Sequence, residues 1–206
     1  MSEQPRRAVS AVRSVEPLVI EFVGNADVCR SPFCSALATS MADSQLVVFG
    51  SSGLLAHDGD PIDPQMAAAL GHVGVRSDRA RSRPLDARIL GGADLVLTMD
   101  SRQRDFVAQC WPDAASKVHG LGQLAAHLAT RGPTAGNASL LQVIEFGIPG
   151  SSDPADDVPD PRGWGEQAIR ETAARLGGLT TAVLREFGLM VVPGARRSAP
   201  RRGAGS

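Results

Sequence analysis

Residues 21–35, which read EFVGNADVCRSPFCS, combine residue types that could bind or attack a phosphate group. Arg30 lies within this stretch, and an arginine can hold two oxygens of a phosphate or arsenate in a bidentate fork. Cys29 and Cys34 lie close to that arginine, and cysteine thiolates are nucleophiles. Anion binding with nucleophilic attack is therefore the first chemistry to consider.

The neighbouring residues predict how this stretch would be held. Residues 18–23 form a short apolar, β-branched run that is typical of a buried strand. Ser31 and Pro32 place an N-cap serine and a first-turn proline before an apolar-periodic helix over 33–41. The loop between them would direct its backbone N–H groups toward the helix N-terminus, which is the geometry of an anion-binding nest.

The stretch resembles the phosphate-binding loop of the low-molecular-weight protein tyrosine phosphatases, which reads F-V-C-x-G-N-x-C-R-S-P. Aligned without a gap, the matching positions are Phe22, Val23, Cys29, Arg30, Ser31 and Pro32. Gly24 stands where the family carries its nucleophilic cysteine, and Ala26-Asp27 stands where the family carries Gly-Asn. The resemblance implies that the phosphate loop comprises Asn25, Ala26, Asp27, Val28, Cys29 and Ser31.

In this family a thiolate attacks phosphorus, while backbone amides and an arginine hold the phosphate oxygens. The resemblance implies that Arg30 is the phosphate-binding arginine and that Gly24 marks the position of a missing nucleophile. We expect Cys29 to point away from the loop centre and Cys34 to be a small buried hydrophobic residue. The carboxylate of Asp27 would repel a phosphate dianion, and we expect it to pair with Arg30 instead.

A second motif lies far along the chain, where residues 157–161 read DVPDP. It matches the family's D-x-x-D-P, in which the aspartate before proline is the general acid, so the resemblance implies that Asp160 has this role. The aromatic residues that usually follow are replaced by Arg162-Gly163-Trp164, and the chain contains no tyrosine. Regulation by phosphorylation of tyrosines in this loop is therefore excluded.

Further apolar runs predict the elements that would position both motifs. We expect strands over 46–49, 94–99 and 117–121, a turn over 51–53, and helices over 64–70, 85–90, 101–110, 123–128 and 165–187. Strands that alternate with helices favour a three-layer α/β fold, with a central parallel sheet of about four strands and helices on both faces. The nest should then lie at the carboxyl end of the first strand.

Composition sets the expected boundaries of the domain. We predict a disordered lead-in over 1–16, a phosphatase-like α/β domain over 17–190, and a disordered Arg/Pro/Gly-rich tail over 191–206. Residues 131–156 carry the weakest signal, and their apolar island 140–148 could be a strand or a short helix. The adjacent glycines 177 and 178 interrupt the last helix, so we expect close packing against another element there.

Charge and composition exclude several classes of protein. A net charge of -1 and a pI near 6.4 give no basic footprint for nucleic acid. Three cysteines favour a reducing cytosol, and no apolar run is long enough for a membrane span, so we expect a soluble cytoplasmic protein. The four histidines lack metal-ligand spacing and no nucleotide-binding loop occurs, so no metal and no cofactor are expected.

Two interpretations of function remain open. The first is an inactive or strongly impaired relative, a pseudophosphatase that binds or regulates a phosphoprotein, a tyrosine-kinase system or a cell-surface polysaccharide system. The second is a working tyrosine phosphatase that has re-routed its nucleophile or retains weak activity. A thioredoxin-coupled arsenate reductase, which shares the fold, needs the same first cysteine and is disfavoured by Gly24. The sequence does not set the oligomeric state.

Overall fold

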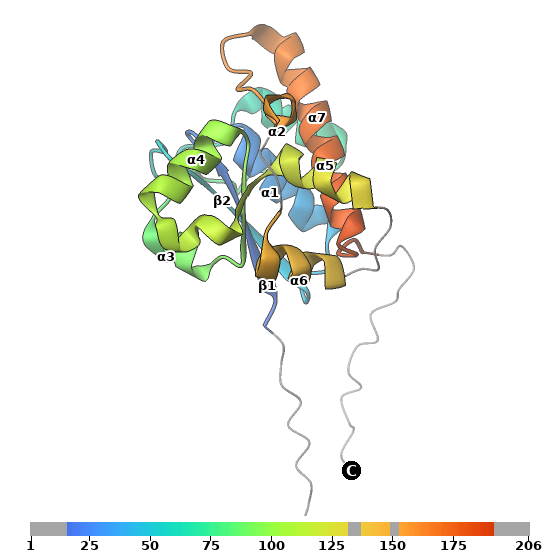
Figure 1. Cartoon of the computed structure of the whole chain (residues 1–206). Coiled ribbons are helices and arrows are strands. Elements are labelled where there is room, and N and C mark those ends of the chain that lie inside the picture. Colours follow the sequence, from blue (N-terminus) through green and yellow to red (C-terminus); the bar gives the residue numbers. More distant parts are fainter. Residues whose placement is uncertain (1–15, 132–136, 149–152, 192–206) are drawn as a thin grey trace, which may run out of the picture.

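The computed structural model of the protein describes residues 16–131, 137–148 and 153–191. Its centre is a sheet of four strands in the order β2-β1-β3-β4, in which every neighbouring pair is parallel (Figure 1). The strands are β1 (Leu18–Gly24), β2 (Val47–Gly53), β3 (Leu95–Thr98) and β4 (Val118–Gly120). This arrangement confirms the predicted α/β fold with a parallel sheet of about four strands.

Helices connect the strands and cover both faces of the sheet (Figure 1). They are α1 (Arg30–Met41), α2 (Pro64–His72), α3 (Ala87–Gly92), α4 (Ser101–Cys110), α5 (Leu121–Arg131), α6 (Asn137–Phe146) and α7 (Gly165–Glu186), with 3-10 helices η1 (Pro112–Lys117) and η2 (Pro154–Asp156). The long α7 packs against α1, α2 and α5. These helices form one layer, and α3 and α4 belong to the other.

The alternation of side chains along β1 explains the two layers. Ile20 and Phe22 belong to the larger apolar cluster, which includes residues of α1, α5 and α7. Val23 belongs to a second cluster with Leu90 and Val107, which come from the α3 and α4 side. Because successive strand residues point to opposite faces, a single apolar strand supplies both cores.

Two predicted boundaries near the loop are wrong by a few residues. The first helix begins at Arg30 with Cys29 in the N-cap position, so Ser31 is the second residue of the helix and not its cap. The predicted turn over 51–53 is instead the end of β2. Gly53 aligns with Gly24 in the ladder, and its N–H and C=O pair with the segment that follows residue 82.

The structure tests three predictions for the C-terminal half of the chain, on the apolar island, the paired glycines and the tail. The apolar island 140–148 lies mainly in a helix, α6. Gly177 has the Leu37 side chain 3.9 Å from the position that a Cβ would occupy, whereas Gly178 has nothing within 4 Å, so the close packing expected at both glycines is wrong for Gly178. Val191, placed in the predicted tail, donates its backbone N–H to Met41. The rest of that tail, the lead-in up to 15, and residues 132–136 and 149–152 lie outside the described residues.

Candidate functional site

The loop between β1 and α1 lies at the carboxyl end of β1, where parallel α/β sheets bind their ligands. Asp27 has a φ of 52°, the only positive φ at a non-glycine residue in the described ranges. Aspartate and asparagine tolerate this left-handed conformation better than most side chains. Ala26 needs no such conformation, so an alanine in place of the family's glycine does not strain the loop.

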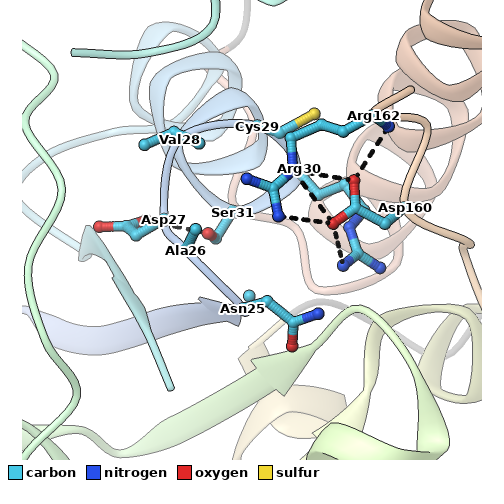
Figure 2. A pocket seen from close by; sticks show the side chains of 10 residues that line it. Asn25, Ala26, Asp27, Val28, Cys29, Arg30, Ser31, Asp160 and Arg162 are labelled. Atoms are coloured by element: carbon cyan, nitrogen blue, oxygen red, sulfur yellow. Dashed lines mark hydrogen bonds and ion pairs between the residues drawn. The ribbon is translucent and has the colours of Figure 1, made fainter. Parts of the chain in front are cut away.

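The side chain of Asp27 braces the loop from within. Its Oδ1 accepts a hydrogen bond from Ser31 Oγ at 2.9 Å, and its Oδ2 accepts one from the backbone N–H of Arg83 at 3.0 Å. Burial raises the pKa of this carboxyl from 3.8 to about 6, although the bond from Ser31 opposes the shift. The expected pairing with Arg30 is wrong, and Figure 2 shows the Asp27 carboxylate directed away from that arginine.

The Ser31 hydroxyl also occupies the space beside Gly24. A Cβ built on Gly24 would lie 2.7 Å from Ser31 Oγ and 3.4 Å from Ser31 Cβ. Any side chain at this position would therefore push the hydroxyl away from Asp27. The residue types at Gly24, Asp27 and Ser31 therefore depend on one another.

Arg30 is buried and already has three acceptors. Its Nη1 donates to the Val158 carbonyl at 2.6 Å and lies 3.3 Å from Asp100 Oδ2. Its Nη2 lies 3.4 Å from Asp160 Oδ2, and Figure 2 shows this pair. The Arg30 side chain is 3% exposed, whereas the side chains of Asp100 and Asp160 are 20% and 27% exposed. The guanidinium is held in place by two carboxylates from distant segments of the chain.

Asp160 reaches the loop from a position 130 residues beyond Arg30. It also pairs with Arg162, whose Nη2 lies 3.3 Å from Asp160 Oδ2. The contact between Asp160 and Arg30 brings the two sequence motifs together, while the role of Asp160 as an acid stays a prediction. Two arginines and two carboxylates, including Asp100, meet at the mouth of the nest.

Both cysteines near Arg30 are buried thiols. Burial is the main cause that raises the pKa of Cys29 to about 12, with the charge of Asp160 adding to it. Burial likewise raises the pKa of Cys34 to about 12, and its side chain is fully enclosed in the core. Both residues belong to the larger apolar cluster, as the expectation of structural packing requires.

Sequence reasoning missed Asp100 and Gln103, two polar residues that position the site, and it gave no partner for Asp157 of the second motif. Asp100 caps α4 by accepting from the Gln103 N–H at 2.8 Å while it holds Arg30. Gln103 donates from Nε2 to Asn25 Oδ1 at 3.0 Å, and Asp157 accepts from both the N–H and the Oγ of Ser101 at 2.8 Å. Asp100 was detectable, because it follows a buried parallel strand and precedes a helix.

Neither a metal centre nor a membrane span is found in the part of the chain that the structure describes. No group of three or more His, Cys, Asp and Glu side chains in residues 16–131, 137–148 and 153–191 could hold a metal ion. No helix within these ranges is long and apolar enough to cross a membrane.

An arginine-bearing loop at the carboxyl end of β1 puts the candidate site where parallel α/β sheets bind their ligands. Comparison with family models then places the chain: residues 19–136 match the model described as low molecular weight phosphotyrosine protein phosphatase, and the chain belongs to that family. The matched region contains the whole nest. It ends before Asp160.

Two bacterial relatives illustrate the similarity in sequence. A probable low molecular weight protein-tyrosine-phosphatase, EpsP, from Ralstonia nicotianae is 28% identical over 110 residues, which cover 53% of this chain and 73% of the relative. The low molecular weight protein-tyrosine-phosphatase Ptp of Acinetobacter johnsonii is 29% identical over 105 residues, covering 51% of this chain and 71% of the relative.

Solved structures share the fold over most of the chain. The YwlE arginine phosphatase from Geobacillus stearothermophilus superposes with a TM-score of 0.64 at 24% identity, covering 84% of this chain and 94% of that one. A low molecular weight protein tyrosine phosphatase from Bacillus subtilis gives a TM-score of 0.62 at 24% identity, covering 83% and 97%. These likenesses support the α/β fold described above.

Proposed function

We propose that this protein is a catalytically inactive or strongly impaired member of its family, a pseudophosphatase that binds or regulates rather than hydrolyses. The observation that carries the proposal is Gly24, at the position where the family's loop has its nucleophilic cysteine. Its neighbour Ser31 fills the adjoining space with a hydroxyl that is committed to Asp27. A phosphoenzyme needs a side-chain nucleophile at this point, and glycine supplies none.

The two remaining cysteines of the loop region are poor substitutes for that nucleophile. The attacking species is the thiolate, and a thiol with a pKa of about 12 is ionised in roughly one molecule in 10⁵ at neutral pH. Active cysteines have lowered pKa values, whereas burial raises the pKa of both thiols here. This chemistry speaks against a nucleophile re-routed to Cys29 or Cys34.

The occupied state of Arg30 supports the same proposal. A phosphate that bound this arginine would compete with the carboxylates of Asp100 and Asp160. The hollow enclosed by the loop has a cavity volume of about 10 Å³, which is the space of about one water molecule. In this conformation the nest is closed over its own ion pairs.

We therefore propose a cytoplasmic role in a phosphoprotein or tyrosine-kinase system that does not depend on turnover. The supporting observation is the family itself, whose relatives EpsP and Ptp are named tyrosine phosphatases. We accordingly propose that Asp160 and Arg30 keep the family's general-acid and phosphate-binding positions, while the loop lacks the nucleophile.

Hydrolysis assays test this proposal directly. The purified protein should hydrolyse para-nitrophenyl phosphate, a phosphotyrosine peptide and a phosphoarginine peptide no faster than buffer alone. Cys29→Ser and Cys34→Ser serve as matched variants, and both should leave this background unchanged. Saturable turnover that Cys29→Ser abolishes and Cys34→Ser preserves would overturn the proposal and identify Cys29 as the nucleophile.

A further inference from the structure

A second concave surface lies beside the sheet edge, apart from the nest. It has a cavity volume of about 430 Å³ and is formed by residues of α1, of β2 and of segment 76–83. Its described lining includes four arginines, Arg76, Arg79, Arg81 and Arg83, and no acidic residue. We name this surface the arginine groove. It shares no described lining residue with the nest.

The positive charge of the arginine groove is only partly compensated. Arg76 pairs with Asp78 at 3.0 Å and Arg83 pairs with Glu21 at 3.1 Å. Arg81 donates only to backbone carbonyls, and within the described residues neither Arg79 nor Arg81 has a carboxylate partner within 4 Å. Two exposed guanidinium groups are therefore available to a negatively charged ligand.

Strand β2, at one wall of this groove, is an edge strand with unused backbone groups. The N–H of Leu18 donates to the Leu46 carbonyl, so the backbone groups of Leu46 and of every second residue after it face β1. The backbone groups of the residues between them, which include Phe49 and Gly53, face outward. Gly53 uses both outward groups to pair with the segment after residue 82. The outward N–H and C=O of Phe49 have no partner in the described part of the chain.

We propose that the arginine groove binds an acidic segment of a partner protein in extended conformation, which pairs with the edge of β2 at Phe49. Main-chain hydrogen bonds along an exposed edge give such a peptide affinity, and alternate side chains give specificity. Acidic side chains on one face of the added strand would reach Arg79 and Arg81. This docking site is independent of the proposed loss of catalysis.

Two other occupants fit the groove less well. The two terminal segments of this chain would be repelled, because 192–206 contain four arginines and no acidic residue, and 1–15 contain three arginines and one glutamate. A single-stranded nucleic acid stacks its bases on exposed aromatic side chains. Phe49, which is half-buried, is the only aromatic residue in the described lining.

Fluorescence polarisation with a labelled peptide of alternating Glu and Val tests the charge requirement. Binding should weaken with added salt and fall roughly tenfold in the double variant Arg79→Glu/Arg81→Glu, since several exposed charge contacts are reversed. The matched control Arg88→Glu, an exposed arginine on α3 outside the groove, should change affinity by less than about twofold. The neutral pair Arg79→Gln/Arg81→Gln should give an intermediate loss, with unchanged circular dichroism spectra.

N-methylation of the same peptide tests the pairing with the strand. One isomer is N-methylated at the Glu residues and the other at the Val residues. The two carry the same charge, but in an extended strand their remaining N–H donors lie on opposite edges. One isomer should bind like the parent peptide and the other should lose most of its affinity. Equal binding of the two isomers, undiminished binding to the charge-reversed variant, or tighter binding of an oligothymidylate than of the peptide would each overturn the proposal.

Discussion

Asp27 places a carboxylate in the interior of the loop, where its ionisation opposes folding. The pKa of the free carboxyl is 3.8 and burial raises it to about 6 in the folded protein, so the native state binds more protons between these pH values. Its contribution to stability is therefore greatest at low pH and is lost as pH rises through the folded pKa. Glu21, also buried and raised in pKa, contributes in the same direction.

We predict that Asp27→Asn removes this part of the pH dependence. The free energy of unfolding of the variant, relative to the wild type, should increase from pH 4 to pH 7 by roughly 2 kcal/mol, from the size of the pKa shift. Asparagine can keep both contacts, because its carbonyl accepts from Arg83 N–H and its amide donates to Ser31 Oγ. Urea titrations at a series of pH values measure the difference.

A control variant at an exposed carboxylate shows whether the effect belongs to Asp27. Asp105→Asn, at a side chain that is 67% exposed, should give a nearly pH-independent difference from the wild type. A constant difference for Asp27→Asn as well would show that its carboxyl does not titrate between pH 4 and pH 7.

Restoring a cysteine at the start of the nest should be limited by Ser31. A Cβ at position 24 displaces the Ser31 hydroxyl, which leaves the buried Asp27 carboxylate with one donor fewer. We predict weak para-nitrophenyl phosphate hydrolysis by Gly24→Cys and a rate roughly tenfold higher for Gly24→Cys/Asp27→Asn, because losing a donor to a buried charge costs about 1–3 kcal/mol.

Two comparisons make this prediction decisive. Gly24→Ser is the matched control and should remain at the buffer rate. Adding Ala26→Gly should bring no further gain, because Ala26 does not adopt a positive φ. If the single and double cysteine variants turn over equally fast, Asp27 and Ser31 do not constrain the position.

At the scale of elements, the end of β2 supports the nest through a glycine. A Cβ on Gly53 would lie 2.5 Å from the Asn25 carbonyl oxygen and 2.7 Å from the Asp27 backbone nitrogen. Both are backbone atoms, so the loop itself would have to move. The close approach of β2 to the loop is thus part of what holds the nest in shape.

We predict that Gly53→Ala lowers the free energy of unfolding by about 1–3 kcal/mol, as overpacking against a fixed backbone does. Gly71→Ala is the control: this glycine lies in α2 with nothing within 4 Å of its Cβ position. It should raise stability by roughly 0.5–1 kcal/mol, because alanine is the better helix former. Thermal unfolding of both variants against the wild type decides the matter, and a neutral Gly53→Ala would contradict the packing argument.

The parallel sheet could be predicted because short apolar runs alternate with helical periods. The predicted helix over 101–110 was correct at both ends. The start of α1 could not, because Ser31 looks like a cap while its hydroxyl bonds to Asp27 from inside the first turn. The second partner of Asp27 was missed for a related reason. It is the backbone N–H of Arg83, and a side chain that bonds to a backbone group 56 residues away leaves no pattern in the sequence.

At the scale of the whole molecule, the site joins the first and last thirds of the chain. Arg30 comes from the first turn of α1, whereas Val158 and Asp160 precede α7, and α7 packs on α1. Asp157 accepts hydrogen bonds from Ser101 and so holds the segment before α7 against the start of α4. The nest is therefore completed by the docking of a distant segment and not by its own loop alone.

The hydrogen bond from Arg30 to Val158 spans 128 positions of the chain, which has a consequence for the order of folding. Contacts of such large sequence separation require costly loop closure and tend to form late. We predict that Arg30→Gln speeds unfolding while leaving the refolding rate nearly unchanged, whereas Phe22→Leu in the central strand slows refolding. Stopped-flow chevron plots measure both rates, and slower refolding of Arg30→Gln would place the closure early. With late closure, a folding chain would have its central sheet in place while Arg30 still lacked its acceptor.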